Sequence, residues 1–329
     1  MIKTTAIFLL LSNISLAQLP TQQRATQFDK FINKPKIEWA AYASDTFNFN
    51  NGQLNVLLLK RFTANKIKAS LPVESRTNQT NKINYKPIDS VNNIILYQPD
   101  DYVMDAEGNT ILKKNPLQKI DSATFKITET TQILYIEDGT LKSYIPFVTP
   151  TLPVFMSTGT YIGERFYFTS CYNYKYKYKS RKKNKLIFLQ QTSKRIKLGT
   201  ADTNNELKTL YGKNMLETLW PSVMENRFAV FTIDSNKQID PKDIESRLGF
   251  MQPLILPLYD STGTIYEFKV LGTAFNTNQF TQALLLQYWY YDETKNIVFN
   301  KIKEMILYIS KRNNNGLEEP VPVIKLVFK

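Results

Sequence analysis

Hydrophobic residues recur at the three-to-four-residue spacing of an amphipathic helix in three stretches of this chain. In the first stretch the apolar positions are Leu54, Leu57, Leu58 and Phe62, which would lie on one helix face against a core. In the last they are Ile297, Phe299, Ile302, Met305, Ile306 and Ile309. The spacing predicts helices over residues 54–64, 210–225 and 297–309, with Pro221 starting or kinking the second.

Other stretches alternate with period two or are continuously apolar, as strands are. Asp105–Asn109, Asp138–Gly139 and Asp260–Gly263 have the composition of hairpin turns. Pro146, Pro150 and Pro153 are expected to interrupt the chain after the second of these turns. Ordered structure is expected to begin at residues 37–42, and strands are predicted over residues 92–97, 123–136, 186–189, 252–259, 264–271, 283–291 and 323–328.

Two pairs of segments resemble each other. Residues 54–67 and 215–228 each combine a predicted helix with a following Asn, a base and an apolar residue, and residues 135–141 and 259–265 each turn at a glycine. A degenerate internal duplication would produce these pairs, and so would the ordinary recurrence of helices and hairpins.

The sequence predicts an α+β fold of antiparallel sheets with hairpins and a few packed amphipathic helices, arranged as two degenerate repeat units. The chain of 329 residues is long enough for one large domain or two modest ones. The predicted parts are a signal peptide (1–17), a flexible N-terminal arm (18–36), a first α+β unit with a basic hairpin (37–200) and a second α+β unit with a C-terminal helix and tail (201–329).

The N-terminus has the three regions of a secretory signal peptide. Lys3 provides the positive charge, Ala6–Leu11 the short apolar core, and Ser15–Ala17 the small-residue exit before Gln18. A membrane span would need about 20 apolar residues. We therefore expect cleavage after Ala17 and a periplasmic location, without the lipid anchor that a cysteine after the cleavage site would carry.

The composition limits the available chemistry. The chain contains no histidine, which excludes Ser-His-Asp and Cys-His catalysis, a histidine proton shuttle and histidine-ligated zinc. Its one cysteine, Cys171, cannot form an internal disulfide. Carboxylate pairs, Ser-Lys or Tyr-Lys chemistry and oxygen-ligated metals remain possible in principle. No motif indicates a cofactor or a metal, and we expect neither.

The formal net charge of +13 comes largely from one stretch. No acidic residue occurs between Glu164 and Asp202, while eleven bases do: Arg165, Lys175, Lys177, Lys179, Arg181, Lys182, Lys183, Lys185, Lys194, Arg195 and Lys197. Alternating Tyr and Lys over residues 174–179, followed by a basic turn, predicts a hairpin with a charged tip. A solvated strand face and a dock for an acidic protein or phospholipid headgroups both fit it, and nucleic acid is not expected for an exported protein.

Aromatic density supplies the other candidate surface. Tyr288–Tyr291 is an unbroken aromatic run that would place two rings on each face of a strand, and buried Trp and Tyr are typical interface anchors. The candidate partner-binding residues are Trp39, Trp289, Tyr291, Lys175, Lys177, Lys179, Arg181, Lys182 and Lys183.

Several of these segments resemble the GldN/PorN family of periplasmic gliding-motility and type IX secretion proteins. The similar segments are the one around Trp39, the 54–64 helix running into Asn65–Ala69, Lys126–Glu129, Ile265–Gly272, and Trp289-x-Tyr291-x-Glu293 before the last predicted helix. The basic Tyr-Lys hairpin departs from the family. The resemblance implies a non-enzymatic component that binds a ring-forming, GldK/PorK-like outer-membrane lipoprotein as part of a hetero-oligomeric ring and reaches the membrane through that partner.

We therefore expect a structural subunit of the type IX secretion machinery. The alternatives are an exported hydrolase that uses a carboxylate pair, and a stand-alone periplasmic module that binds an acidic ligand through the basic hairpin.

Overall fold

The structure of the protein is a computed structural model. It describes residues 35–74, 83–88, 101–113, 125–156, 159–172, 185–198, 207–212, 214–240, 242–244, 246, 248, 254–271, 276–313 and 315–328. The predicted signal peptide, nearly all of the N-terminal arm, the predicted strand over 92–97 and the tip of the basic hairpin lie outside these residues. Within them, no helix has the length and apolar character needed to cross a bilayer.

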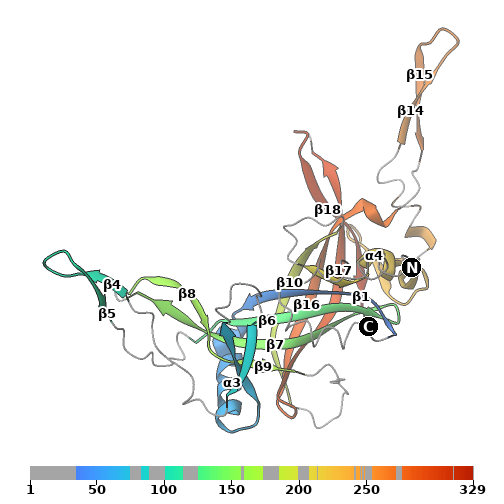
Figure 1. The fold of residues 1–329 in the computed structure, drawn as a ribbon. Coiled ribbons are helices and arrows are strands. Elements are labelled where there is room, and N and C mark those ends of the chain that lie inside the picture. The colour runs from blue at the N-terminus through green and yellow to red at the C-terminus, as the bar shows by residue number, and fades with distance from the viewer. Residues whose placement is uncertain are drawn as a thin grey trace, which may run out of the picture.

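Two large antiparallel sheets form the body of the molecule (Figure 1). The strands of the first are β1 (Ile37–Phe47), β2 (Ala69–Glu74), β3 (Ile83–Ile88), β6 (Thr128–Glu137), β7 (Thr140–Phe155), β8 (Tyr161–Phe166), β9 (Thr169–Cys171) and β11 (Lys208–Tyr211). Their order in space is β11-β1-β6-β7-β9-β2-β3, and β8 pairs with the far end of β7.

The second sheet contains the longest strands of the C-terminal part. They are β10 (Leu186–Lys197), β12 (Ala229–Thr232), β13 (Gln238–Ile239), β16 (Phe280–Asp292), β17 (Ile297–Arg312) and β18 (Glu318–Val327), in the spatial order β10-β16-β17-β18-β12-β13. Two separate hairpins complete the fold, β4 (Asp101–Met104) with β5 (Thr110–Lys113) and β14 (Leu254–Tyr259) with β15 (Ile265–Leu271).

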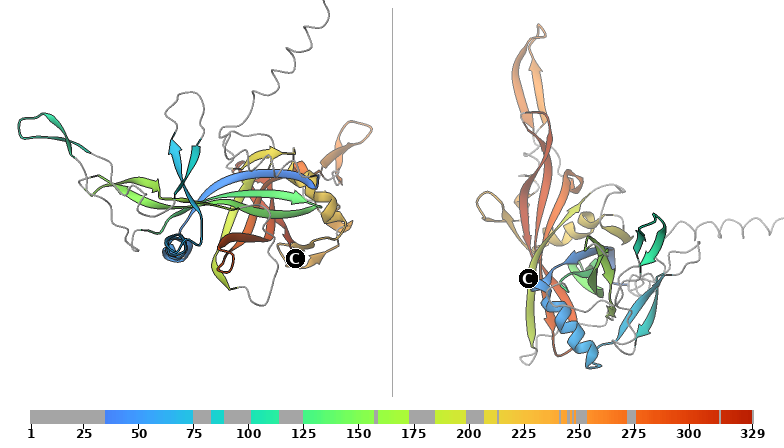
Figure 2. Two further views of the ribbon diagram at one scale, coloured as in Figure 1. Left: turned by 60° about the horizontal axis from the view of Figure 1, so that its bottom comes forward. Right: turned by 90° about the vertical axis from the view of Figure 1, so that its left-hand side faces the viewer.

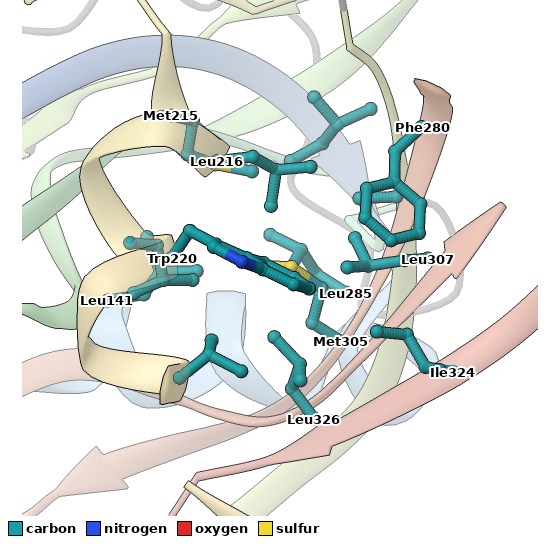
Figure 3. Packing of buried hydrophobic residues seen from close by; sticks show 14 of the residues in the cluster. Leu141, Met215, Leu216, Trp220, Phe280, Leu285, Met305, Leu307, Ile324 and Leu326 are labelled. Carbon is teal, nitrogen blue, oxygen red and sulfur yellow. The ribbon is translucent and has the colours of Figure 1, made fainter. Parts of the chain in front are cut away.

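The two sheets pack face to face, and β1, β6 and β7 run across the strands of the second sheet (Figures 1 and 2). One apolar cluster joins both sheets to the helix α4 (Met215–Met224), where Trp220 points at the strands and its ring lies 5.8 Å from that of Phe280 (Figure 3). A second cluster joins the sheets to α3 (Gln53–Thr63), where Phe62 stacks on Phe168 at 5.2 Å. The chain is thus mostly antiparallel sheet with few helices.

The predicted helix over 54–64 is confirmed as α3, and the one over 210–225 is confirmed from Met215 onward. α4 begins at Asn214, whose side chain accepts hydrogen bonds from Leu216 N and Glu217 N, as an N-cap does. It continues through Pro221, which is exposed to solvent. Leu210 and Tyr211 belong to β11 instead, because this strand pairs with β1.

Both helices end in the same way. The residue after each helix cap, Asn65 or Asn226, takes a left-handed conformation with φ of 54° and 60°. The next residue then donates its N–H back into the last turn, from Lys66 to Arg61 O at 2.8 Å and from Arg227 to Ser222 O at 3.0 Å. Asparagine tolerates this conformation better than most residues, which explains why both helices are followed by an asparagine.

The predicted helix over 297–309 is wrong, because this segment is strand β17. Its buried residues alternate as far as Ile302 and resume the alternation at Met305. The pairing with β16 passes from Gln287–Ile302 to Leu286–Glu304, so Lys303 is an extra residue in a β-bulge. The bulge shifts the alternation by one position and produces a three-residue step that resembles helical spacing.

The expected interruption at the prolines is also wrong, since β7 runs from Thr140 to Phe155 through all three. Pro146 lies where two residues of β7 oppose the single residue Gln132 of β6. Pro150 pairs with Thr128 at the end of β6, and Pro153 pairs with β8. Proline has no backbone N–H to donate to a neighbouring strand. Bulges and strand ends accommodate it because fewer such hydrogen bonds are formed there.

The predicted hairpin turns are confirmed. Asp138 and Gly139 both have positive φ, 51° and 67°, and form the two-residue turn between β6 and β7. The turns at Asp105–Asn109 and Asp260–Thr264 share another design, in which the aspartate Oδ1 accepts N–H groups two and four residues later. The glycine turns of residues 135–141 and 259–265 therefore differ in structure.

Strand pairing crosses the predicted boundary at residue 200. β10 precedes it and pairs with β16, while β11 follows it and pairs with β1. The turn at Gly139 also lies directly against α4, where a Cβ on this glycine would clash with Ser222 Oγ. Residues 37–200 and 201–329 consequently share both sheets.

Candidate protein-binding surfaces

The most exposed apolar surface belongs to the β14–β15 hairpin, which stands away from both sheets (Figures 1 and 2). Ile255, Tyr259, Tyr266 and Phe268 are 57–64% exposed. Neither sheet pairs with this hairpin. Since a lone two-stranded hairpin is at best marginally stable in water, its apolar side chains indicate a contact surface for another molecule.

These four side chains share one face of the hairpin. Pro257 pairs with Phe268 and Leu258 with Glu267, so odd positions of β14 share a face with even positions of β15. Tyr266 is the extra residue where the register shifts. The opposite face carries Glu267 and Lys269, so one face is aromatic and apolar while the other is mixed.

A second projecting hairpin, β4–β5, has the same character on a smaller scale. Met104 is 77% exposed, and Leu112, which belongs to the same face, is 51% exposed. The turn between its strands is held by Asp105, whose pKa is lowered by hydrogen bonds from Asn109, first from its backbone and then from its side chain. The ionised carboxylate thus holds the turn in place while the apolar side chains face solvent.

A further surface, which we call the aromatic face, lies on the outward side of the second sheet. It consists of Phe188 on β10, Tyr288 and Tyr290 on β16, and Phe299 and Tyr308 on β17. The Phe188 ring lies 5.9 Å from Tyr288 and 5.6 Å from Tyr290, and Tyr290 stacks on Phe299 at 5.4 Å. Phe188 is 49% exposed and the other rings are partly buried.

The structure places the three aromatic candidates from the sequence inside the molecule. Trp39, Trp289 and Tyr291 are buried in the two apolar clusters. Trp289 Nε1 donates to Thr192 Oγ1 at 2.8 Å, and the Tyr291 hydroxyl donates to Asn296 Oδ1 at 3.1 Å. Their contacts are internal. The expectation that these three residues are surface anchors is therefore corrected, because they belong to the core.

Strand alternation explains the difference. In β16 every second side chain points into the core, so the buried Trp289 and Tyr291 alternate with the outward Tyr288 and Tyr290. The sequence alone does not show which of these two faces of β16 is buried. The burial of Leu285 and Ala283 on the side of Trp289 fixes which face is inside.

The basic candidates Lys175, Lys177, Lys179, Arg181, Lys182 and Lys183 lie outside the described residues. The returning strand that the sequence predicts after them is present as β10. Their proposed role stays a prediction.

The interior contains a polar layer where the two apolar clusters meet. The strands β1, β7, β10, β16 and β17 each contribute inward side chains to both clusters, and on each strand a polar inward residue lies between the two sets. β6 contributes one further polar residue to the same layer. Lys194 Nζ donates to both carboxylate oxygens of Asp45, at 2.6 and 2.7 Å. The layer consists of Asp45, Gln132, Ser143, Lys194, Gln287 and Asn300.

Hydrogen bonds link the amide and hydroxyl side chains of this layer. Asn300 Nδ2 donates to Gln287 Oε1 at 3.1 Å, and Gln132 Nε2 donates to Ser143 Oγ at 2.9 Å. Among the described residues, no group of three His, Cys, Asp or Glu side chains is placed to hold a metal ion. The carboxylate of Asp45 is engaged by the ammonium of Lys194.

No protein-family model matches the chain, and no curated protein sequence matches it significantly.

Proposed function

We propose that this chain is a non-enzymatic structural subunit of the type IX secretion and gliding-motility machinery, located in the periplasm. In this role it binds a ring-forming outer-membrane lipoprotein and reaches the membrane through that partner, within a hetero-oligomeric ring. The resemblance of its segments to the GldN/PorN family supports this assignment, and so does the signal-peptide pattern of residues 1–17.

The observation that carries the proposal is the β14–β15 hairpin. A soluble protein that works alone seldom exposes four large apolar side chains on one face of an isolated hairpin. A subunit that inserts the hairpin into a neighbouring protein would bury this face. Residues 265–272, one of the segments that resemble the GldN/PorN family, include strand β15 of this hairpin.

One of the segments that resemble the family, residues 289–293, is followed by a different element from the one expected. Residues 289–293 precede strand β17, where a helix was expected. The resemblance therefore rests on the segments around Trp39, α3, the start of β6 and β15.

We further propose that the two helix units descend from one duplicated unit. The support is their matching C-terminal caps, with Asn65 and Asn226 in the same left-handed conformation. The different turns of the two glycine hairpins limit this relationship to the helices and the residues that follow them.

Affinity purification from detergent-solubilised envelopes of the native cells tests the function. We expect the tagged wild-type chain to bring down an outer-membrane lipoprotein in a stoichiometric amount. The variant Tyr266→Ser/Phe268→Ser should lose it, while the control Glu267→Ser/Lys269→Ser on the opposite hairpin face should retain it. Recovery of the wild-type chain without a lipoprotein would refute the proposed function.

A further inference from the structure

We propose that the aromatic face of the second sheet is a separate docking surface for an acidic protein. This inference goes beyond the proposed function, because it uses different residues from the β14–β15 hairpin and specifies the chemistry of its partner.

The first argument is the composition of the surface. Phe188, Tyr290 and Phe299 form a continuous ring cluster across three neighbouring strands. Aromatic residues and arginine are the side chains most enriched in the energetically important centres of protein interfaces. A sheet face with such a cluster, which spans three strands, suits a protein partner better than it suits a single small ligand.

The second argument is charge. Cations lie over outward rings at three places: Arg195 Cζ is 5.7 Å from the Tyr308 ring, Lys301 Nζ is 5.8 Å from Tyr290, and Lys325 Nζ is 5.4 Å from Phe231. Lys197 adds a fourth outward base, opposite Gln282. In the central part of these strands the outward positions carry one carboxylate, Glu304.

The environment of Lys301 is consistent with a positively charged face. Its pKa is lowered, mainly by burial and secondarily by the positive charge of Lys303. A carboxylate brought close by a partner would offset that repulsion, and complementary charge also accelerates association. The geometry therefore favours a partner whose surface presents Asp and Glu around apolar side chains.

The test measures binding of the full mature chain to washed envelopes from native cells that lack the chromosomal copy. One half of the envelopes is treated with proteinase K and the other half is not. The charge-reversal variant is Arg195→Glu/Lys301→Glu. The matched control is Lys66→Glu/Lys242→Glu, which changes the net charge equally at exposed positions outside the strands that carry the aromatic face.

We expect the Arg195→Glu/Lys301→Glu variant to bind untreated envelopes about tenfold more weakly than the control. Binding of the wild-type chain should fall as NaCl rises from about 50 mM to about 500 mM and should be lost after proteinase treatment. Circular dichroism checks that each variant is folded, and a misfolded double variant is replaced by Arg195→Gln/Lys301→Gln.

Equal binding of the charge-reversal variant and its control would overturn the inference, as would no binding of the wild-type chain. Binding that survives proteinase treatment would also overturn it and indicate an anionic lipid or polysaccharide. The Tyr266→Ser/Phe268→Ser variant separates the two proposals: if it alone loses binding, the hairpin function stands and the docking surface falls.

Discussion

The ammonium of Lys194 on β10 lies 2.6 Å and 2.7 Å from the two carboxylate oxygens of Asp45 on β1. The Lys194 side chain is 7% exposed and that of Asp45 is 20% exposed. The pair joins the two sheets at the level where one apolar cluster gives way to the other. It therefore couples the position of β10 to that of β1.

Removing the carboxylate should destabilise the fold more than removing the ammonium. Asp45→Ala leaves a buried, uncompensated ammonium, and we expect the free energy of unfolding to fall by about 3 kcal/mol. Lys194→Met should cost less, because Asp45 reaches water, and Asp45→Leu/Lys194→Met should recover most of the loss. Urea denaturation measures all three.

The control is the pair of Lys142 with Glu137, at 2.8 Å, in which the lysine side chain is 38% exposed. Lys142→Ala should change the free energy of unfolding by less than about 1 kcal/mol. A loss at Lys142 equal to the loss at Asp45 would contradict the structural role of the buried pair.

Gly139 should tolerate no side chain. Gly139→Ala would place a Cβ against Ser222 Oγ at a residue with φ of 67°, and we expect a loss of about 2–3 kcal/mol in unfolding free energy. Gly108→Ala is the matched control, since Gly108 has φ of 84° and nothing within 4 Å of the Cβ position. It should cost about 1 kcal/mol, from the left-handed backbone conformation alone. Similar losses for the two variants would show that the turn does not contact α4 as described.

Tyr167 should make the fold sensitive to alkali. Its hydroxyl is buried with no hydrogen-bond partner among the described residues, and burial raises its pKa to about 12. In the unfolded chain a tyrosine has a pKa near 10. The free energy of unfolding that this difference contributes is present below pH 10 and is lost as the pH rises to about 12, by up to about 3 kcal/mol. Tyr167→Phe should remove this part of the loss and change stability at pH 7 by less than about 1 kcal/mol. Identical denaturation midpoints of the two proteins across pH 10–12 would contradict it.

The β14–β15 hairpin should be dispensable for the stability of the body. No strand of either sheet pairs with it, so replacing residues 254–271 by a short Gly-Ser linker should shift the melting temperature by no more than about 2 °C. Differential scanning calorimetry provides the measurement. A large drop would mean that the exposed face of the hairpin contacts the body of the molecule.

The sequence predicted elements best where local chemistry decides them. The apolar stripe of α3 is a local signal, and the Asp138–Gly139 turn requires residues that accept positive φ. β17 was mistaken for a helix because the bulge at Lys303 is set by pairing with β16, and no local feature reveals a shift in register. The same limit applies to Pro146, whose place in β7 depends on the residue opposite it.

The candidate site was predictable only in part. The aromatic run in β16 was visible in the sequence, but two-residue alternation leaves open which of Tyr290 and Tyr291 faces the core until a partner sheet is known. For the β14–β15 hairpin a local signal did exist, since its strands carry apolar residues at positions of both faces. Such strands need cover on both sides, and the proposed partner would supply that cover.

Site-specific photo-crosslinking in native cells tests the central claim most directly. A photoreactive residue at Phe268 should yield a crosslink to an outer-membrane lipoprotein, because this side chain is 60% exposed on the apolar hairpin face. The same residue at Glu217, exposed on α4, should yield none. A lipoprotein crosslink at Phe268 alone is the result predicted by the proposed function, whereas no crosslink at Phe268 above the level at Glu217 would contradict it.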